Sequence, residues 1–459
     1  MKEVDVFIIG TGFCASTVAS QLAEESLSVQ LLEPSSGETL IKFTKTVDSI
    51  FSEGQVNKTS GLGGGSIVWG KAVTHPNDKN WFVSRGNKAW ESLGVSLPAV
   101  ILPTEMNIPK PKLGYSNFVR RFLPSLQGRF HEEIGQYAGH RLGPLNTFSL
   151  PQIDQNHLML ATVIDLRVQY NGYLVTLREK DGTTSQWACK NLVLASGTFL
   201  NACFFSLLSG QKEFPLSNHF SADFGRILLK KPVAIVDGVQ TYANGEREFS
   251  TFTTRSSTQD IRERPNTSIR LQGNSYLIGR KTIVLALLKL QYSFLVKSII
   301  PYLFSALKGA RLVDDLVIRV VADQKIHQSN KMKVLNFEEG FFHVEVNLKI
   351  EDQVISDAYA AVEEFVELVS HSRIVRSTEM FDQDKITWDD PAHYFGTTPI
   401  GLYNYSSSLT SDSESSLYPR LYIIGNSSFP VGSHGHPTLL GMQLAMIVAS
   451  KILFNEKGE

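Results

Sequence analysis

Four residues near the start of the chain have the types and spacing of a nucleotide-binding turn. Gly10, Gly12 and Ala15 fit the pattern Gly-x-Gly-x-x-Gly/Ala, and Glu33 follows about 20 residues later. Gly10 allows a tight turn, Gly12 lets the backbone approach a pyrophosphate, and the small Ala15 lets a helix pack closely on a strand. A carboxylate at Glu33 is placed to accept hydrogen bonds from an adenosine ribose. These residues predict dinucleotide binding.

The elements that must position these residues are recognisable on both sides of the turn. Residues 4–9 are apolar and largely β-branched, as expected of a parallel strand buried on both faces. They lead directly into the turn, which also contains Phe13 and Cys14, and a helical pattern follows. A second apolar run, 29–32, ends at Glu33. The alternative is a glycine-rich turn in an unrelated α/β protein.

Length and composition limit the classes of protein to consider. A chain of 459 residues is too long for one simple core, so two domains or one large two-lobed unit is expected. The 44 basic and 45 acidic residues give no bulk charge that would attract nucleic acid. The three cysteines suggest neither a disulfide framework nor a metal site, which favours a reducing compartment. The first strand begins too close to Met1 for a signal peptide, so we expect a cytoplasmic protein.

Two further loops have the composition of a backbone that approaches a bound nucleotide. Residues 61–70 contain three consecutive glycines before Ser66, and such a run is costly to order unless something passes close to it. We interpret this glycine run as backbone that approaches the dinucleotide. A flexible linker is the alternative, which the apolar residues directly after Ser66 disfavour. Farther on, the strand-like run 191–195 leads into Ser196 and Gly197, a second strand and loop of Rossmann character.

The remaining patterns are less specific. Strand-like runs return from residue 158, with a hairpin at 172–182 whose turn contains Asp-Gly. Residues 406–416 are polar and of low complexity, and they predict a surface loop. Residues 282–307 are strongly apolar, but two lysines and a proline interrupt the run of ~20 apolar residues that a membrane span requires. We expect buried helices there; a helix lying on a membrane surface is the alternative.

Two blocks near the C-terminus resemble the signature of one enzyme family. The first is His393-Tyr394-Phe395-Gly396-Thr397. The second runs from the strand-like segment 421–424 to Pro430 and then to His436, six residues past that proline, with Pro437 and Thr438 following. Together they resemble the C-terminal signature of the glucose–methanol–choline (GMC) family of FAD-dependent oxidoreductases. In one respect the chain departs from it: Pro399-Ile400 replaces the Arg-Met that often continues the first block.

Other segments resemble the same family in the same order along about half of the chain. They are the glycine loop at 63–66, the strand at 192–199 and the turn at 216–226, where the family's chain leaves the flavin domain; the segment 322–334 resembles it weakly. Val68 stands where some members carry a histidine linked covalently to the flavin, so the resemblance implies non-covalent FAD. The predicted cofactor-binding residues are Gly10, Gly12, Phe13, Cys14, Ala15, Glu33, Gly64, Gly65, Ser66, Val163, Ser196, Gly197, Gly425, Asn426, Pro437 and Thr438.

The resemblance also implies a fold and a division into domains. We expect an α/β protein, α+β overall, in which a Rossmann-like FAD-binding domain is interrupted by a substrate-binding domain of sheet and helices. The FAD-binding domain comprises residues 1–75, 155–228 and 385–459, and the substrate-binding domain or lid comprises 76–154 and 229–384.

The family's reaction removes a proton from an alcohol O–H and passes hydride from its carbon to the flavin. A histidine suits the base, because its unperturbed pKa lies near the working pH. By resemblance the two catalytic side chains are His393 and His436, and we favour His393 as the base. We expect His434 to have a supporting role and His219 a structural one. No histidine pair has zinc-type spacing, so no metal is expected.

Several functions are compatible with these features. The leading hypothesis is an FAD-dependent oxidoreductase that oxidises the CH–OH group of a sugar, polyol or other alcohol. The alternative within the same fold is a GMC-like lyase or decarboxylase without net alcohol oxidation. A non-catalytic flavoprotein and a protein that binds only NAD are weaker alternatives. The electron acceptor is left open between oxygen, a quinone and another protein, and a membrane contact of 282–307 would favour the quinone.

Overall fold

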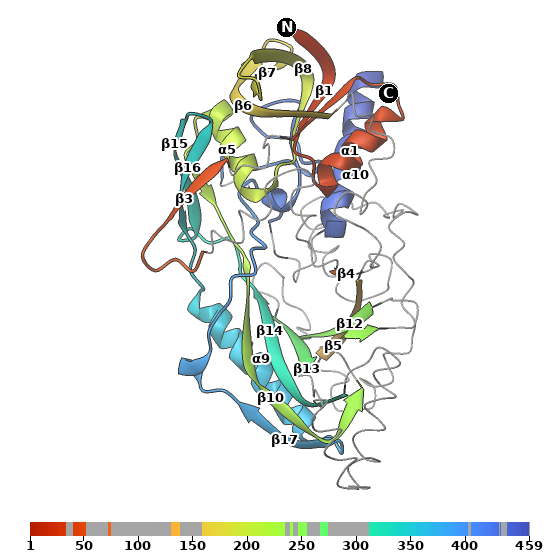
Figure 1. Cartoon of the computed structure of the whole chain (residues 1–459), viewed down its shortest axis with the longest axis vertical. Helices are drawn as coiled ribbons and strands as arrows, with labels where there is room; N and C mark the ends of the chain where they lie inside the picture. Colours follow the sequence, from red (N-terminus) through yellow and green to blue (C-terminus); the bar gives the residue numbers. More distant parts are fainter. Residues whose placement is uncertain are drawn as a thin grey trace, which may run out of the picture.

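A computed structural model describes most of the chain, in segments: residues 1–33, 40–51, 72–74, 130–137, 158–234, 239–241, 247–254, 267–273, 312–402, 405–430, 432 and 438–458. These residues form three sheets, arranged along one long axis with both chain termini at the same end (Figure 1). The mixed sheets and helices confirm the predicted α/β fold class. Within the described part, no helix is both long and apolar enough to cross a membrane. The apolar segment 282–307 lies outside the described residues.

The six-stranded sheet at the end with the termini contains the predicted dinucleotide motif. Its parallel part runs in the order β6 (Leu158–Gln169), β2 (Val29–Glu33), β1 (Lys2–Ile9), β8 (Thr184–Leu194) and β18 (Leu421–Ile423). Strands β1, β2, β8 and β18 end at one edge of the sheet, where β6 begins beside the end of β2. In open α/β sheets, ligands bind at the carboxyl ends of the parallel strands.

Two of these strands also belong to an antiparallel meander. The start of β6 pairs with β2, and its remainder pairs with β7 (Gly172–Glu179). In the same way β8 first pairs with β7 and then continues beside β1. The predicted hairpin with its Asp-Gly turn is therefore confirmed as the connection between β7 and β8; Gly182 in that turn has a φ of +83°.

Helices cover both faces of the parallel strands. Along β1, Val6 and Ile8 pack on one face with α1 (Phe13–Ala23) and α10 (Thr438–Lys457). Phe7 and Ile9 pack on the other face with α5 (Gly197–Ser209). Alternate side chains point to opposite faces of a strand, so a run that is apolar at every position is buried on both sides. This explains why residues 6–9 are apolar at every position.

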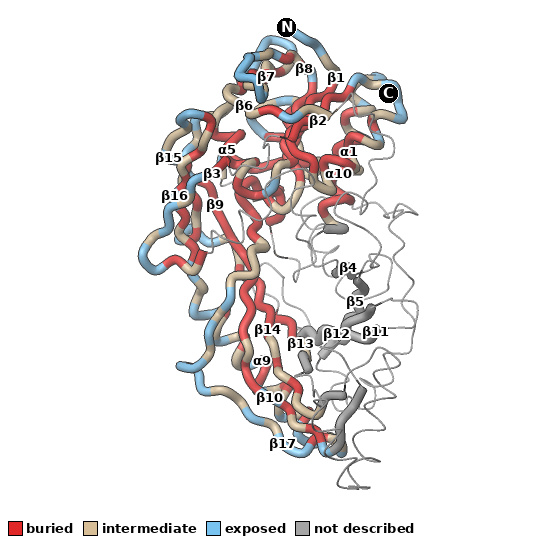
Figure 2. The backbone as a smooth tube through the Cα atoms, viewed as in Figure 1, coloured by how far each residue is buried: buried red, intermediate tan, exposed pale blue. Residues whose placement is uncertain are grey.

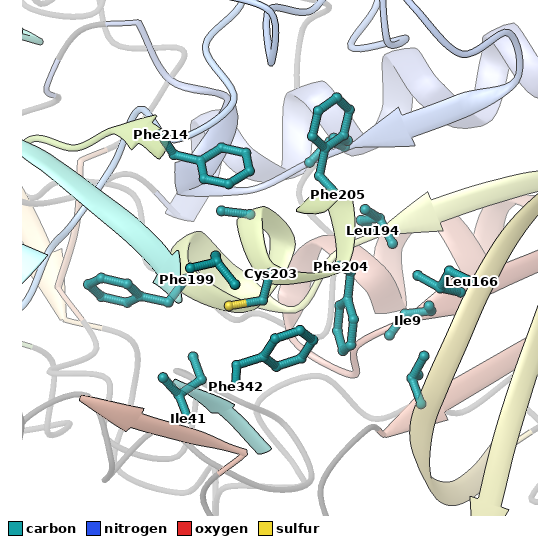
Figure 3. Packing of buried hydrophobic residues seen from close by; sticks show 14 of the residues in the cluster. Ile9, Ile41, Leu166, Leu194, Phe199, Cys203, Phe204, Phe205, Phe214 and Phe342 are labelled. Atoms are coloured by element: carbon teal, nitrogen blue, oxygen red, sulfur yellow. The ribbon is translucent and has the colours of Figure 1, made fainter. Parts of the chain in front are cut away.

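A four-stranded sheet lies on the far side of α5. Its order is β3 (Ile41–Lys45), β16 (Phe341–Asn347), β15 (Lys331–Glu338) and β9 (Glu213–Pro215). Figure 3 shows Phe204 of α5 near Ile9 and Leu166, while Cys203 of the same helix lies toward Phe342 and Ile41. The helix is thus buried between two sheets. Residues 331–347, predicted above to lie in the substrate-binding domain, pair here with β3 and β9, two segments predicted to lie in the FAD-binding domain.

The eight-stranded sheet forms the opposite end of the molecule (Figure 1). Its helix, α9 (Asp352–Ser370), packs an apolar face on the sheet around Phe224, Ile318 and Phe365, so this end has its own buried core (Figure 2). The strands run in the order β17 (Val375–Met380), β10 (His219–Ala234), β14 (Leu312–Asp323), β13 (Thr267–Gly273), β12 (Arg247–Thr254), β5 (Phe130–Tyr137) and β4 (Ala72–Thr74), with β11 (Val239–Thr241) beside β12.

The polar segment 406–416 is not a surface loop, and that prediction was wrong. Ser407 and Ser413 have no exposed surface, and Ser408 is 2% exposed. The hydroxyl of Ser407 donates to the carbonyl of Thr397 at 3.0 Å. Serine hydroxyls readily bond to nearby backbone groups, so a serine-rich segment can be buried when the backbone offers enough partners. Composition alone did not reveal those partners.

Candidate functional site

The carboxyl edge of the parallel sheet begins at a glycine that the backbone requires. Gly10 follows β1 with a φ of +120°, and its N–H donates to the carbonyl of Leu32 at 2.7 Å. A Cβ at Gly10 would lie 2.3 Å from the carbonyl oxygen of Ala195, at the end of β8. No other residue fits where these two chain segments cross. The sequence motif therefore has a steric cause in the structure.

Two further glycine turns lie at the same edge and face open space. Gly197 follows β8 with a φ of +83°, and Gly425 follows β18 with a φ of +102°. A Cβ at either position would meet no atom of the described residues within 4 Å. Asn426 begins the short 3₁₀ helix η6 (Asn426–Ser428) directly after Gly425. Bare backbone beside open space is what a bound nucleotide requires, so both turns fit a cofactor cradle.

The helices that start at this edge are suited to bind an anion. Gly12 caps α1 and Ser196 caps α5, and neither helix has a side-chain hydrogen bond at its cap. Helix N-termini present backbone N–H groups and the positive end of the helix dipole, which together favour a pyrophosphate. At the end of β2, Glu33 is 5% exposed and accepts a hydrogen bond from the hydroxyl of Thr11. The donor and acceptor set fits a dinucleotide such as FAD.

Other predicted cofactor residues serve packing through their side chains. Ala15 has no exposed surface and lies between α1 and its sheet, and Phe13 begins α1. The sulfur of Cys14 lies 2.8 Å from where a Cβ on Gly441 of α10 would stand. Burial raises the pKa of the Cys14 thiol to about 12, so this thiol is not reactive at neutral pH. Val163 is 1% exposed within the core of the sheets.

Several predicted residues lie outside the described part of the chain. They are Gly64, Gly65, Ser66, Pro437 and one of the two predicted catalytic histidines, His436; His434 lies there too. Thr438 begins α10, but only its backbone is described. Their predicted roles stay predictions. Within the described residues, no group of three or more histidine, cysteine, aspartate or glutamate side chains could hold a metal ion.

Asn201 holds the edge together, and the sequence analysis missed it. Its side chain is fully buried in α5. The Oδ1 atom accepts from the N–H of Ser196 at 2.8 Å, while Nδ2 donates to the carbonyl of Ile424 at 3.0 Å and to the hydroxyl of Ser427 at 2.8 Å. One amide thus joins the turns after β8 and β18. The available signal was an asparagine within an otherwise apolar helix, since a buried amide must find partners.

The block of residues 393–397 is attached directly to this edge. The Thr198 hydroxyl donates to the carbonyl of Tyr394 at 2.7 Å, and the Thr397 hydroxyl donates to the carbonyl of Thr198 at 2.9 Å. Beyond the block, Thr398 N–H donates to the carbonyl of Ser427 in η6 at 2.9 Å. The first turn of α5 and the turn after β18 therefore fix the block beside the open glycine turns. The residue that precedes this anchor is His393.

His393 is partly buried and makes a close contact with a second histidine. Its Nδ1 lies 2.7 Å from Nε2 of His219, and the two ring centroids are 4.4 Å apart with the planes inclined by 29°. Burial, aided by the positive charge of Arg270, lowers the pKa of His393 to about 4. His393 is therefore neutral at pH 7 and can accept a proton. The sequence analysis gave His219 a structural role; the structure places it against the predicted base.

A carboxylate network fixes the backbone at His393. Asp390 accepts hydrogen bonds from Nδ2 of Asn218 at 2.7 Å, from the N–H of Ala392 at 2.9 Å and from the hydroxyl of Tyr394. Asn218 in turn accepts from the N–H of His393 at 3.1 Å through Oδ1. Ala392 has a φ of +59°, a left-handed conformation that costs free energy in a residue other than glycine. The network compensates for this strain and sets the direction of the imidazole.

The comparisons with known proteins support the fold. No family model and no curated protein sequence matches the chain. Among solved structures, the chain is similar to pyridoxine 4-oxidase from Mesorbium loti, with a TM-score of 0.59 and 13% sequence identity over 98% of this chain and 99% of that one. At this identity the likeness shows a shared fold alone. It agrees with the fold expected from the GMC resemblance, and function must be argued from the site.

Proposed function

We propose that this chain is an FAD-dependent oxidoreductase of the GMC type that oxidises a CH–OH group. One observation supports the proposal most strongly. A partly buried imidazole, neutral at pH 7, belongs to the residue next to Tyr394, whose carbonyl is bound by the first turn of α5 beside the glycine turns. A base beside a redox cofactor is the minimum needed to oxidise an alcohol.

The residues that would hold FAD follow from the carboxyl edge of the sheet. The turn of Gly10 and Gly12 and the start of α1 would receive the pyrophosphate, and Glu33 would accept from the adenosine ribose. The turns at Gly197 and Gly425 would lie along the remainder of the molecule. When bound, the flavin supplies a hydride acceptor. We propose that it is bound non-covalently, as the valine at position 68 suggests.

In this proposal His393 takes the proton of the substrate hydroxyl. Its neutral state at pH 7 leaves a ring nitrogen able to accept that proton. We propose His436 as the second side chain at the alcohol oxygen. A sugar or polyol is the proposed substrate class. The cytoplasmic location and the identity of the electron acceptor are also proposals, and oxygen uptake during turnover would separate an oxidase from a dehydrogenase.

An anaerobic absorption experiment tests the proposed function. The purified protein, loaded with FAD, is mixed with pyridoxine, D-glucose, glycerol or benzyl alcohol while the visible flavin band is recorded. We expect one of these alcohols or a close analogue to bleach the band, and His393→Ala to slow bleaching by about 10²-fold or more. His327→Ala is the matched control, because His327 is an exposed histidine whose ring bonds to Ser329.

The outcomes of this experiment separate the alternatives. Bleaching that is equally fast in wild type and His393→Ala would contradict the assignment of the base. A bound flavin that no alcohol reduces, although the substrate panel has been extended, would favour the lyase or decarboxylase alternative. Acid precipitation should release the flavin into solution; a yellow pellet would contradict non-covalent binding.

A further inference from the structure

The two faces of the eight-stranded sheet differ in character. On one face, Ala222, Ile269 and Val320 belong to the core that packs on α9. Neighbouring residues along a strand point to opposite faces. His219, three residues before Ala222 on β10, therefore points to the other face, and its ring contacts that of His393. The proposed base thus lies on the face of the sheet opposite α9.

A row of charged residues crosses this same face. The strand register places Asp223 of β10 opposite Arg319 of β14, and Arg319 opposite Arg270 of β13. Directly opposite residues have their side chains on one face, with Cβ atoms roughly 5 Å apart. Arg319 binds Asp223 at 3.2 Å and Asp389 at 2.8 Å. Two carboxylates thus offset the charge of Arg319, and Arg270 brings a second guanidinium to the row.

Arg270 lies near the place of the proposed reaction. It is partly exposed. Its positive charge acts on His393, where it adds to the effect of burial in lowering the pKa. Coulomb interactions weaken with distance, so a charge that acts on His393 also acts on a substrate whose hydroxyl lies beside that imidazole.

We propose that Arg270 binds an oxyanion of the substrate, so that the alcohol oxidised by this protein carries a carboxylate or a phosphate group. The inference rests on the proposed function, in which the hydroxyl of the substrate lies beside His393. It narrows the proposed substrate class from any sugar or polyol to one with a negative charge.

The chemistry of arginine suits this role. A guanidinium stays charged at physiological pH, and its planar fork of N–H groups matches the paired oxygens of a carboxylate or phosphate. Its five donors allow it to bond to a protein group and to a ligand at once. Like charges directly opposite each other in a sheet are destabilising. An anion beside Arg270 offsets the repulsion between Arg270 and Arg319, so the sheet itself favours binding one.

Charge also sets the direction in which such a substrate lies. Asp323 is paired with His219 across β10 and β14 and is 3% exposed. The row that contains Arg270 crosses β10 four residues farther along, which is about 13 Å at roughly 3.3 Å per residue. The negative group of the substrate therefore points away from Asp323 and toward Arg270, while its hydroxyl lies at His393.

An anion at Arg270 also helps the proposed base. His393 becomes positively charged when it takes the hydroxyl proton, and the positive charge of Arg270 opposes this change. A carboxylate or phosphate bound to Arg270 offsets that charge. An anionic substrate therefore makes His393 a better proton acceptor than a neutral alcohol does, and the same contact favours both binding and reaction.

Nitrogen NMR of the arginines tests the inference without flavin or alcohol. Apo-protein labelled with ¹⁵N at its arginines is titrated at pH 7 with inorganic phosphate, and separately with acetate, at constant ionic strength; Arg270→Lys identifies the Arg270 signal. We expect a saturable shift of the Nε–H signal of Arg270 with at least one of the two anions. Arg167 of β6 is the internal control, since its side chain is 71% exposed. No saturable shift at Arg270, or the same shift at Arg167, would overturn the inference.

Flavin reduction by matched alcohols gives a second readout and separates the two kinds of anion. FAD-loaded protein is mixed anaerobically with D-glucose, D-glucose 6-phosphate or D-glucuronate, and with glycerol, glycerol 3-phosphate or glycerate. We expect a charged member to be preferred over its neutral parent, and Arg270→Gln to lower this preference roughly 10- to 100-fold, mainly through KM. Arg270→Lys, which keeps the charge without the fork, should lose less. Arg167→Gln should keep the wild-type preference.

The preferred member of each set identifies the anion as phosphate or carboxylate. Preference for the neutral parents in the wild-type protein would contradict the inference, as would an unchanged preference in Arg270→Gln.

Failure of this inference and failure of the proposed function are distinguishable. Anion binding at Arg270 is measured in the apo-protein, so it can be observed even if no alcohol reduces the flavin. Conversely, reduction of the flavin by neutral alcohols without anion binding at Arg270 would contradict this inference alone. If Arg270→Gln does not fold, the titration of the wild-type protein and Arg270→Lys still decide the question.

Discussion

The two edges of the parallel sheet are built from opposite kinds of residue. At the amino edge, Lys190 donates to Asp5 at 2.9 Å and to Glu456 at 3.2 Å, and Nδ2 of Asn191 donates to Glu456 at 3.0 Å. Arg420 forms a further ion pair with Glu456 at 2.5 Å. Polar side chains thus join β1, β8, the entrance to β18 and the end of α10. At the carboxyl edge, glycine turns face open space.

This difference shows how one sheet divides stability from function. Side chains at the amino edge bond to one another and fasten segments that are far apart in the sequence. The carboxyl edge has bare backbone and helix N-termini, whose donors are completed by a ligand. We therefore expect substitutions at the amino edge to change the free energy of unfolding, and substitutions at the carboxyl edge to change binding and catalysis.

The largest effect is expected at Gly10, where a residue is needed both for stability and for FAD binding. Gly10→Ala would place a Cβ 2.3 Å from a backbone oxygen at a φ of +120°. We therefore expect the free energy of unfolding to fall by about 3 kcal/mol or more and FAD binding to be lost. The matched control is Gly425→Ala, which has a φ of +102° but open space around the new methyl group. It should lose about 1–2 kcal/mol, fold, and bind FAD poorly. Urea unfolding and flavin absorbance measure both properties.

Equal stability of the two variants would contradict the steric account of Gly10. Normal FAD affinity in Gly425→Ala would remove the turn after β18 from the cradle.

The next effect concerns pH: the carboxyl edge and the amino edge should lose stability over different pH ranges. His393 has a pKa of about 4 when folded, below its ordinary value, so the unfolded chain binds the proton first as the pH falls. Stability should be lost between about pH 6.5 and pH 4, by up to about 3 kcal/mol, and His393→Gln should abolish this loss. Unfolding in urea at a series of pH values measures it. An unchanged profile in the variant would contradict the burial of a neutral imidazole.

The amino edge should respond at lower pH and independently of FAD. Burial disfavours the Glu456 carboxylate, but hydrogen bonds from Asn191 and Lys190 outweigh this and hold the pKa of Glu456 below its usual range. Its contribution is therefore complete above the unfolded pKa of about 4.5 and is lost as the pH falls through the lower, folded value. Glu456→Gln should cost about 1–3 kcal/mol at pH 7 and leave FAD affinity unchanged. Weaker FAD binding in Glu456→Gln would contradict the assignment of cofactor binding to the carboxyl edge.

The smallest expected effect is on affinity alone. Glu33→Gln keeps an acceptor for the Thr11 hydroxyl but removes the charge that would bind the ribose. We expect FAD to bind roughly 10-fold more weakly, or about 1.4 kcal/mol, with little change in stability. A titration of apo-protein with FAD measures it, and unchanged affinity would contradict the role of Glu33 at the ribose.

The sequence predicted the parts of the fold that local patterns determine. The Gly10 turn, the flanking strands and Glu33 depend on neighbours along the chain, so their types and spacing identify the motif. The burial of Ser407 depends on a backbone partner in another segment, the carbonyl of Thr397, and composition was misleading there. Helix α5 is largely apolar because two sheets enclose it, which no single segment reveals.

The sequence predicted the reactive residue of the site but not the residues that hold it in place. His393 was singled out from the block that contains it, and His219 was expected only to be structural, whereas Asn201 stands in a segment without a motif. The contact of His219 with His393 and the bonds of Asn201 join segments far apart in the sequence. Such supporting residues become visible only once the chain is folded.

Binding of FAD to the apo-protein tests the central claim most directly. The wild-type protein, freed of any flavin, is titrated with FAD while flavin fluorescence is followed, and Gly425→Ala and Glu456→Gln are titrated in parallel. We predict one FAD bound per chain, weak binding in Gly425→Ala and wild-type affinity in Glu456→Gln. No binding by the wild-type protein, or equal loss in both variants, would contradict the assignment of the carboxyl edge as the cofactor site.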